Sequence, residues 1–245
     1  MRDTSTYSRV RSQQHFDRQV TTLEKKRRRE RAIEGRVIDN DPMLMDLSYR
    51  LRYQVYCVER GFLNAGDYPD RLERDEFDRF SLHIGVLNDE RGLIATSRLV
   101  KVSMAGLPLF RHCDIFSNEH ELYREENRIA EISRLCMSRE LRDRQAGGSF
   151  IALSLYRATY QASKRVGLTH WLAAMEPSLH RLLSALGVPF RVIGPVSDYF
   201  GPVAPYLLDL HEFDEIILSG RRPRLRSFVE GLEPQFHPGA FMGVV

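Results

Sequence analysis

Strand-like and helix-like segments follow one another in an order that limits this chain to a few architectures. Two runs with strand character, 81–87 and 93–102, are separated by Asn88-Asp89-Glu90-Arg91-Gly92, which predicts a hairpin. A third strand is expected at 128–137, and a long amphipathic helix follows it from about 149 to 166. The first half of the fold is therefore an antiparallel unit whose last strand leads into a helix.

The second half repeats the pairing of strand with helix. A strand is expected at 169–175, a helix with Pro177 in its first turn at 177–186, and further strands at 188–193 and 203–210. The complete order predicts an α+β, three-layer domain, in which helices cover both faces of a mixed central sheet.

An additional helix precedes the first hairpin. Residues 39–41 offer candidate N-caps before Pro42, and the helix is expected to end near Gly61. Its predicted apolar face consists of Leu44, Leu47, Leu51, Val55 and Val58. An acidic loop rich in turn-forming residues follows at 67–78.

The charge distribution divides the chain into a basic N-terminal arm at 1–36, a folded domain at 37–215 and a basic C-terminal extension at 216–245. Residues 1–40 hold 11 Lys and Arg against 6 Asp and Glu, a net charge of +5 within a chain whose total is +3. Such an arm favours an anionic partner, and nucleic acid, anionic lipid and an acidic carrier protein all fit. A solvated helix face or mobile tail is the alternative. The basic cluster at 25–31 has no interleaved aromatic residues, which argues against specific nucleic-acid recognition.

Several classes of protein are disfavoured by simple counts. The longest apolar runs are shorter than the roughly 20 residues of a membrane span, and charges replace the apolar part of a signal peptide. We therefore expect a cytoplasmic protein. Three scattered cysteines and eight histidines without ligand spacing predict neither disulfides nor a metal site.

Four separated stretches carry the residues of chemical interest. They are Leu51-Arg52-Tyr53-Gln54-Val55-Tyr56-Cys57 with Arg60-Gly61-Phe62, Glu73-x-Asp75-x-Phe77-Asp78, Thr96-Ser97-Arg98-Leu99, and Glu131-Ile132-Ser133-Arg134-Leu135. Arg98 and Arg134 are expected on neighbouring strands. Their guanidinium groups either pair with Asp75 and Asp78 or clamp the carboxylate of an acceptor.

Taken together, the four stretches resemble the acyltransferases associated with the PEP-CTERM/exosortase system. These are relatives of long-chain N-acyl amino acid synthases and, more distantly, of acyl-homoserine-lactone synthases. The resemblance covers roughly residues 37–212. It implies a GNAT fold, a thioester of acyl-carrier protein or coenzyme A as the acyl donor with no permanently bound cofactor, and an amino acid amine as the acceptor.

Two other functions stay open. An acyl-homoserine-lactone synthase would use S-adenosylmethionine, but Phe62 stands where tryptophan is expected in that family. A non-catalytic GNAT-fold module tethered by its basic arm is the second. For the arm, with Arg221, Arg222, Arg224 and Arg226, we expect an acidic carrier protein as partner, or peripheral contact with the anionic inner membrane.

Glu131, Arg98 and Arg134 are the candidate catalytic residues. Strict alternation would place Glu131 and Arg134 on opposite faces of their strand. The resemblance implies a bulge here that brings both toward one cleft. An amino acid arrives as an ammonium ion, so a base is needed, and Glu131 is the candidate. An acyl-enzyme on Cys136 is a weaker alternative, because an isolated cysteine in a strand is usually a small buried apolar residue.

The remaining candidates bind the two substrates. Those for the acceptor are Arg52, Tyr56, Phe62, Asp75, Asp78 and Ser133. Those for the donor are Leu135 and Met137, whose backbone N–H groups would stabilise the oxyanion, with Arg139, Arg142, Arg144, Gly147, Gly148 and Ser149 around the phosphate. An apolar acyl pocket is expected among Leu153, Tyr156, Trp171, Leu172, Met175 and Phe190.

Overall fold

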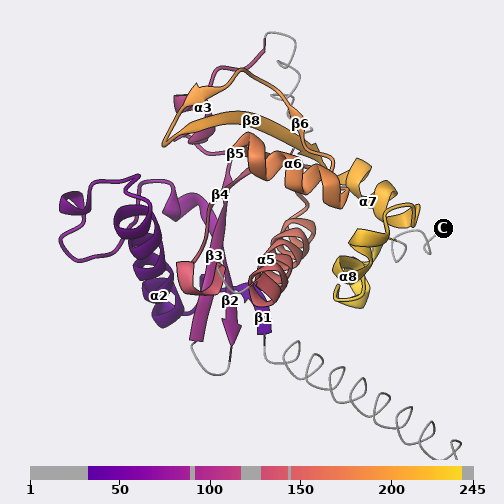
Figure 1. Ribbon diagram of the computed structural model, residues 1–245, viewed down its shortest axis with the longest axis horizontal. Coiled ribbons are helices and arrows are strands. Elements are labelled where there is room, and N and C mark those ends of the chain that lie inside the picture. Colours follow the sequence, from indigo (N-terminus) through magenta and orange to yellow (C-terminus); the bar gives the residue numbers. More distant parts are fainter. Residues whose placement is uncertain (1–32, 89–91, 117–127, 143–144, 239–245) are drawn as a thin grey trace, which may run out of the picture.

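The computed structural model describes residues 33–88, 92–116, 128–142 and 145–238. Its strands form one mixed sheet in the order β1-β2-β3-β4-β5-β8-β6, with β7 paired to β8 (Figure 1). The strands are β1 Ile33–Val37, β2 Ser81–Asn88, β3 Gly92–Lys101, β4 Ile129–Met137, β5 His170–Met175, β6 Arg191–Val192, β7 Ser197–Asp198 and β8 Pro202–Asp209. The predicted mixed sheet is confirmed.

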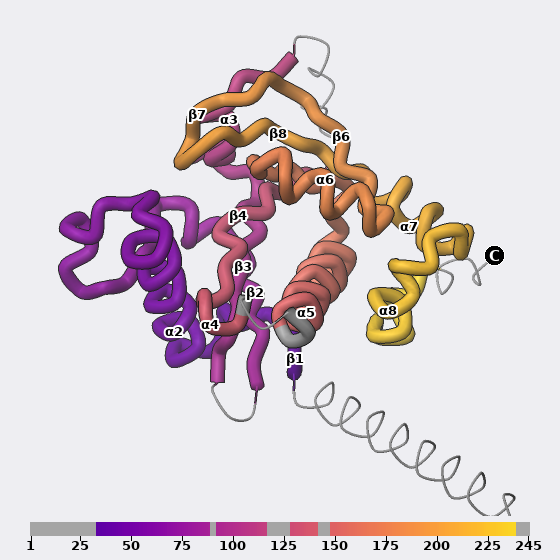
Figure 2. Tube along the Cα trace, viewed as in Figure 1, coloured from indigo at the N-terminus to yellow at the C-terminus, as the bar shows by residue number. Residues whose placement is uncertain are grey.

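Helices lie on both faces of the sheet. They are α2 Pro42–Tyr53, the π-helix η1 Gln54–Glu59, α3 Leu109–His112, α4 Arg139–Arg142, α5 Gln145–Arg165, α6 Pro177–Leu186, α7 Leu210–Leu218 and α8 Arg226–Val229, with short 3₁₀ turns at 65–67, 78–80, 223–225 and 234–236. Helices α2 and α5 stand on opposite sides of β2–β4 (Figure 2). The three-layer arrangement follows from these two helices.

The start of α2 has the expected caps, but its buried face differs from the predicted one. Asp41 accepts hydrogen bonds from the N–H groups of Met43 and Leu44, and Pro42 opens the helix. The buried residues of α2 are Leu44, Ser48 and Arg52, spaced four apart, whereas Leu47 is 36% and Val58 56% exposed. The predicted apolar face differs from the buried one because two polar side chains of α2 are buried. Ser48 bonds to Thr96, and Arg52 bonds to Glu73.

The strand pairing opens in the middle of the sheet. β4 and β5 are parallel neighbours with register pairs only from Ile129–His170 to Glu131–Leu172. Beyond these pairs β4 stays bonded to β3, whereas β5 stays bonded to β8. A gap therefore separates the C-terminal halves of β4 and β5.

A bulge in β4 accompanies this opening. Register pairs with β3 run from Arg98–Ser133 to Thr96–Cys136, so β4 contains one residue more than β3 between them. Arg134 has φ of +51°, a left-handed conformation that few non-glycine residues adopt. The predicted bulge is confirmed, and Arg134 lies in it.

Four predicted boundaries need correction. Residues 33–36, assigned to the arm, belong to β1, which pairs with β2; the rest of the arm lies outside the described residues. The boundary at 215 falls inside α7, and Phe228 and Phe236 of the C-terminal extension join the main core. The long helix α5 begins at Gln145 rather than near Ser149, and the expected strand at 188–193 is only Arg191–Val192.

Candidate active site

A cavity of about 440 Å³ occupies the gap between β4 and β5. Its walls come from both faces of the sheet, because η1 supplies Val55 and Tyr56 whereas α5 and α6 supply Tyr156, Leu179 and Leu183. The other lining residues are Arg60, Phe62, Glu131, Ile132, Ser133, Arg134, Leu135, Cys136, Met137, Ala173, Ala174, Met175, Glu176, Phe190, Tyr199, Phe200 and Val203. The cavity thus passes through the sheet where the strands part.

Glu131 lies at the point where β4 and β5 separate. Its side chain is almost completely buried, and its Oε2 accepts a hydrogen bond of 2.7 Å from the backbone N–H of Leu109 in α3. Burial raises the pKa of Glu131 to about 7, although the Leu109 N–H and the guanidinium groups of Arg98 and Arg134 act in the opposite direction. A carboxylate with this pKa can take up and release a proton near neutral pH.

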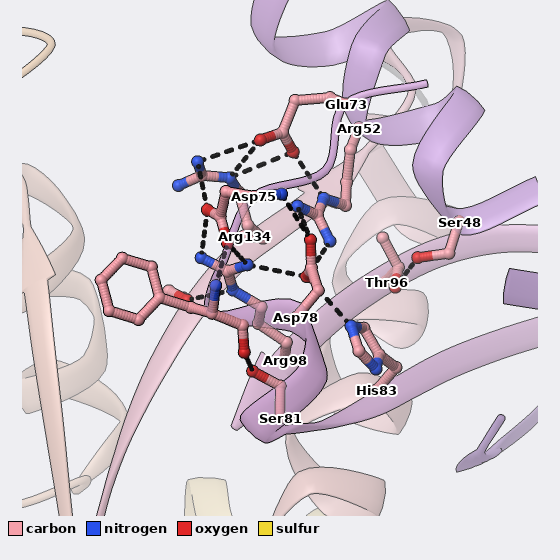
Figure 3. A network of polar contacts seen from close by, with 12 residues as sticks. Ser48, Arg52, Glu73, Asp75, Asp78, Ser81, His83, Thr96, Arg98 and Arg134 are labelled. Carbon is pink, nitrogen blue, oxygen red and sulfur yellow. Dashed lines mark hydrogen bonds and ion pairs between the residues drawn. The ribbon is translucent and has the colours of Figure 1, made fainter. Parts of the chain in front are cut away.

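A network of ion pairs packs between α2, the loop at 73–78 and the bulge of β4 (Figure 3). Arg52 of α2 donates Nε–H to Glu73 at 2.5 Å and binds both carboxylate oxygens of Asp78, at 2.7 and 3.1 Å. Arg52 is 1% exposed and Glu73 is fully buried. These bonds explain why a charged residue occupies the buried face of α2.

The two strand arginines complete the network. Arg98 donates to both oxygens of Asp75, at 2.6 and 2.8 Å, to Asp78 at 2.7 Å and, through Nε, to Ser133 at 2.9 Å. Arg134 donates to Glu73 at 3.0 to 3.1 Å and to Asp75 at 3.1 Å. Of the two predicted roles for these arginines, pairing with the loop carboxylates is the one that the geometry supports.

Arg98 does not reach the cavity, which corrects its predicted contact with the acceptor. All three guanidinium nitrogens of Arg98 already donate to protein oxygens, and the side chain is 1% exposed. Asp75 and Asp78 likewise lie outside the cavity lining, and Arg52 is buried behind them. Tyr56, Phe62, Ser133, Arg134 and Glu131 do line the cavity.

The network is electrically balanced. The three arginines at 52, 98 and 134 face the three carboxylates at 73, 75 and 78, and burial of such charges is tolerated when they are paired. Burial acts to raise the pKa of Glu73, but Arg52 and Arg134 hold it below its ordinary value. His83 bridges Asp78 and Asp39 at 3.1 and 2.7 Å, and these bonds raise its pKa despite burial.

Aromatic side chains surround the bulge and the cavity mouth. The Tyr56 hydroxyl donates to the carbonyl of Leu135 at 3.3 Å, and the Arg134 guanidinium lies 5.4 Å from the centre of the Tyr56 ring. Phe62 stacks on Phe200 at 6.1 Å between ring centres, and Phe200 has a positive φ of 58° in the turn between β7 and β8. Parts of the chain 138 residues apart in sequence thus meet across the cavity.

The predicted donor residues divide into four groups. Leu135 and Met137 line the cavity. Arg139 and Arg142 are in α4, and the Arg139 N–H donates to Glu59 at 3.3 Å. Arg144 lies outside the described residues. Gly147, Gly148 and Ser149 belong to α5, so the expected glycine-rich loop is corrected to helix.

The expected acyl pocket is half right. Tyr156, Met175 and Phe190 line the cavity, but Leu153, Trp171 and Leu172 do not. Trp171 is held in the main core, where its indole N–H donates to Ser163 at 2.8 Å. Cys136 is a buried thiol beside the cavity.

Several residues of this region are not among the candidates that the sequence suggests, and Glu176, Leu179 and Leu183 of the cavity lining are examples. Glu73 lies two residues before Asp75 in the same motif, and this spacing is a usable signal. Arg60 directly precedes Gly61 and Phe62 in another of the motifs. Tyr199 and Phe200 lie in a short turn with no local signal, and only the tertiary structure brings them to the cavity.

Comparisons with known proteins concern part of the sequence and the fold. Residues 51–150 match the Acetyltransferase (GNAT) domain family. A comparison with curated protein sequences gave no match. Within the described residues, no helix has the length and apolar character needed to cross a membrane.

Solved structures with the same fold include three acyl-transferring enzymes. FeeM, an N-acyl amino acid synthase from uncultured soil microbes, aligns with a TM-score of 0.56 at 21% identity, over 77% of this chain and 97% of its own. BjaI, a CoA-dependent acyl-homoserine lactone synthase with SAM and isopentyl-CoA, has a TM-score of 0.56 at 19% identity, over 86% and 99%. The AHL synthase LasI has 0.52 at 16% identity, over 73% and 88%.

These findings fix the fold and the class of domain. The predicted GNAT fold is confirmed by the sheet and by the solved structures. The family match over residues 51–150 agrees with the predicted acyltransferase, whereas the domain bounds 37–215 stay a prediction.

Proposed function

We propose that this protein transfers a long-chain fatty acyl group from the thioester of acyl-carrier protein or coenzyme A to the amine of an amino acid. The observation that carries the proposal is the cavity through the sheet, which Glu131 lines at the point where β4 and β5 separate. Tyr56, Arg60 and Phe62 line the cavity on the side of η1, and Tyr156, Leu179 and Leu183 line it on the side of α5 and α6. An amine acceptor and a fatty thioester can therefore approach the same point from opposite faces.

Glu131 acts as the general base. The acceptor ammonium loses a proton to the Glu131 carboxylate, directly or through a water, and the free amine attacks the thioester carbonyl. The carbon–nitrogen bond forms, the carbon–sulfur bond breaks, and the thiolate leaves and takes up a proton. Backbone N–H groups near Leu135 and Met137 stabilise the oxyanion of the intermediate. Arg134 fixes the bulge through its bonds to Glu73 and Asp75.

The acyl chain lies along the apolar end of the cavity. Tyr156 of α5, Leu179 and Leu183 of α6, and Phe190 supply that wall. Hydrocarbon transferred from water to such a wall gains about 0.8 kcal/mol for each methylene. Long chains are therefore preferred as long as the cavity has room for them.

The phosphate of the donor binds near the N-terminus of α5. Backbone N–H groups in the first turn of a helix of 21 residues attract an anion, and Gly147 and Gly148 lie in this turn. Arg139 in α4 precedes it. This placement moves the donor site from the predicted loop to the start of the helix itself.

An acidic carrier protein docks on the basic C-terminal surface. Arg221, Arg222, Arg224 and Arg226 are exposed there, close to the end of α6, where Arg224 donates to the carbonyl of Ala185. Binding through such a surface weakens with added salt. The same charges would allow peripheral contact with an anionic membrane inside the cell, and the link to exosortase processing stays a prediction from the resemblance.

The decisive experiment is product analysis. The purified protein is incubated with long-chain acyl-carrier protein or acyl-CoA and a mixture of amino acids, and the products are identified by mass spectrometry. An N-acyl amino acid is the expected product. Absence of any amide with both donors would contradict the proposal.

An acyl-homoserine lactone synthase is the second candidate, favoured by the fold shared with LasI and BjaI. The same incubation is repeated with S-adenosylmethionine as acceptor. An acyl-homoserine lactone in place of an N-acyl amino acid would make this the primary function.

A further inference from the structure

Four charged side chains line the cavity, and they differ in the partners they already have. They are Arg60, Glu131, Arg134 and Glu176. The Arg134 guanidinium is bound to Glu73 and Asp75, and the charges of its network are balanced. Glu176 is exposed at the start of α6 and accepts a bond from Ser178 at 3.2 Å. Of these groups, Glu131 and Glu176 would repel the carboxylate of an acceptor when ionised, and Arg134 is already paired with protein carboxylates.

Arg60 is the exception. Its guanidinium lies 5.7 Å from the centre of the Phe62 ring, and within the described part of the chain it forms no ion pair with a carboxylate. Its backbone is fixed, because its N–H donates to the carbonyl of Val55 at 3.0 Å at the end of η1. Shortly after Arg60, the backbone N–H groups of Phe62 and Leu63 both donate to the carbonyl of Tyr56. The exposed guanidinium of Arg60 therefore lines the cavity from a backbone that hydrogen bonds hold in place.

The side of the sheet identifies the ligand. η1 continues α2, which stands on the face opposite α5 (Figure 2). The donor phosphate is proposed to bind at the N-terminus of α5, on the face opposite η1, so the acceptor is the substrate expected on the side of Arg60. The neighbouring Glu59 reaches the start of α4 by accepting from the backbone N–H of Arg139. The planar guanidinium suits a carboxylate, which it can bind through two parallel hydrogen bonds.

We propose that Arg60 binds the carboxylate of the acceptor and thereby restricts the enzyme to amines that carry a free carboxylate. The inference rests on the proposed function and deepens it, because it names the chemical group by which the acceptor is selected. Arg60 takes the role that the sequence suggested for Arg98 and Arg134. The Phe62 ring lies against the guanidinium and is itself stacked on Phe200, so it limits the directions in which the guanidinium can turn.

The test compares two probes that differ only in charge, N-decanoylglycine and N-decanoylglycinamide. Binding of each is measured by calorimetry at low salt to the full-length wild type, Arg60→Gln, Arg60→Lys and Arg79→Gln. Arg79 is the matched control, because it is also exposed and also lies over a phenylalanine, Phe80 at 4.6 Å, but it does not line the cavity. This measurement requires no turnover.

The wild type and Arg79→Gln are expected to bind the carboxylate probe about tenfold or more tightly than the amide, since a charge-assisted pair is involved. Arg60→Gln is expected to lose this preference with its affinity for the amide unchanged, and Arg60→Lys to keep part of it. Equal binding of the two probes by the wild type, binding of neither, or an undiminished preference in Arg60→Gln overturns the inference.

Kinetics separate this inference from the proposed function. With an amino acid as acceptor, Arg60→Gln is expected to raise KM about tenfold or more with little change in kcat, because the carboxylate does not take part in bond formation. With the amino acid amide as acceptor, wild type and variant should be equal, and a KM effect of the same size on both acceptors overturns the inference. A wild type that shows the binding preference but forms no amide contradicts the proposed function alone.

Discussion

The backbone N–H of Leu109 donates a hydrogen bond of 2.7 Å to Oε2 of Glu131, from a helix 22 residues earlier in the chain. This bond fixes the direction of a carboxylate that is 2% exposed. Burial at this position is what brings the pKa of Glu131 close to neutral.

The Glu131→Gln variant is predicted to lower kcat by about 10²- to 10⁴-fold, because it removes the base. The glutamine oxygen can still accept from Leu109, so the fold should survive, and above pH 7 the free energy of unfolding should equal or exceed that of the wild type. Glu176→Gln changes the other carboxylate of the cavity and serves as the control, with a smaller loss expected. Equal losses in the two variants would remove Glu131 from its assigned role.

The pH dependence of the wild type should follow Glu131. The base works only when ionised, so kcat/KM is predicted to rise with pH through a midpoint at the Glu131 pKa of about 7. This component should be missing from the profile of Glu131→Gln. A profile of unchanged shape in the variant would assign the titration to another group.

Arg52→Met is predicted to lower the free energy of unfolding by about 3 to 5 kcal/mol, because it removes the buried cation that pairs with both Glu73 and Asp78 and leaves the network with one more carboxylate than guanidinium groups. Arg50 is two residues before Arg52, on the exposed side of α2. Arg50→Met breaks only the surface pair with Asp46 and should lower the free energy of unfolding by about 1 kcal/mol or less. Urea titrations of both variants measure the difference. Similar values for the two would mean that the buried network contributes little.

Stability at acid pH should depend on the same network. Burial opposes ionisation of Asp78, but its bonds to His83 and Arg52 hold the pKa well below the ordinary value. A lowered pKa contributes stability that is present above the unfolded-state pKa of about 4 and is lost as the pH falls through the folded-state pKa. The free energy of unfolding of the wild type should therefore fall on acidification below about pH 4, and less steeply in Asp78→Asn. Parallel curves would refute this assignment.

The contribution of His83 to the free energy of unfolding changes with pH in the opposite direction. Its pKa is raised by its bonds to Asp39 and Asp78, so its contribution is complete below the unfolded-state pKa of about 6.5 and is lost as the pH rises through the folded-state pKa. His83→Asn should remove this alkaline loss of stability. Urea titrations between pH 6 and 9 test it, and a loss of the same size in the variant would contradict the prediction.

The length of the accepted acyl chain should respond to α6. Leu183 is 3% exposed and lines the cavity, whereas its neighbour Leu182 is 57% exposed. Leu183→Trp is predicted to shift the preference toward shorter acyl donors, because the indole occupies space at the apolar end. Leu182→Trp should keep the wild-type preference. Rates with a series of acyl-CoA lengths provide the measurement, and unchanged selectivity in Leu183→Trp would place the acyl chain elsewhere.

The fold could be predicted from sequence because its strongest elements carry local signals. The alternating runs in β2 and β3, Asp41 with Pro42 at the start of α2, and Gly187 at the end of α6 each mark a boundary by short-range chemistry. Strand β1 is not predicted because only Ile33 and Val37 of its five residues are apolar side chains, and the pairing with β2 is a long-range property. The helical start of α5 was missed because two adjacent glycines favour a loop.

The sequence predicts many of the residues that gather at the site but not the role of each one. The motifs brought Arg98 and Arg134 to the same region as Asp75, as expected, but sequence could not tell which guanidinium nitrogens would be used up. That depends on the left-handed bulge at Arg134, which turns its side chain toward Glu73. Tyr199 and Phe200 reach the cavity through the β7–β8 turn, which no pattern connects with the rest of the site.

The balanced charges of the buried network also limit how this protein can diverge. Loss of one member, such as Glu73, leaves three buried guanidinium groups facing two carboxylates, so a replacement there is expected to survive only when Arg52 or Arg134 changes as well. Among homologues, these positions are thus expected to co-vary or to stay fixed together, whereas the apolar cavity wall is free to drift one residue at a time. New acyl specificities can then arise without disturbing the frame that holds the reacting groups.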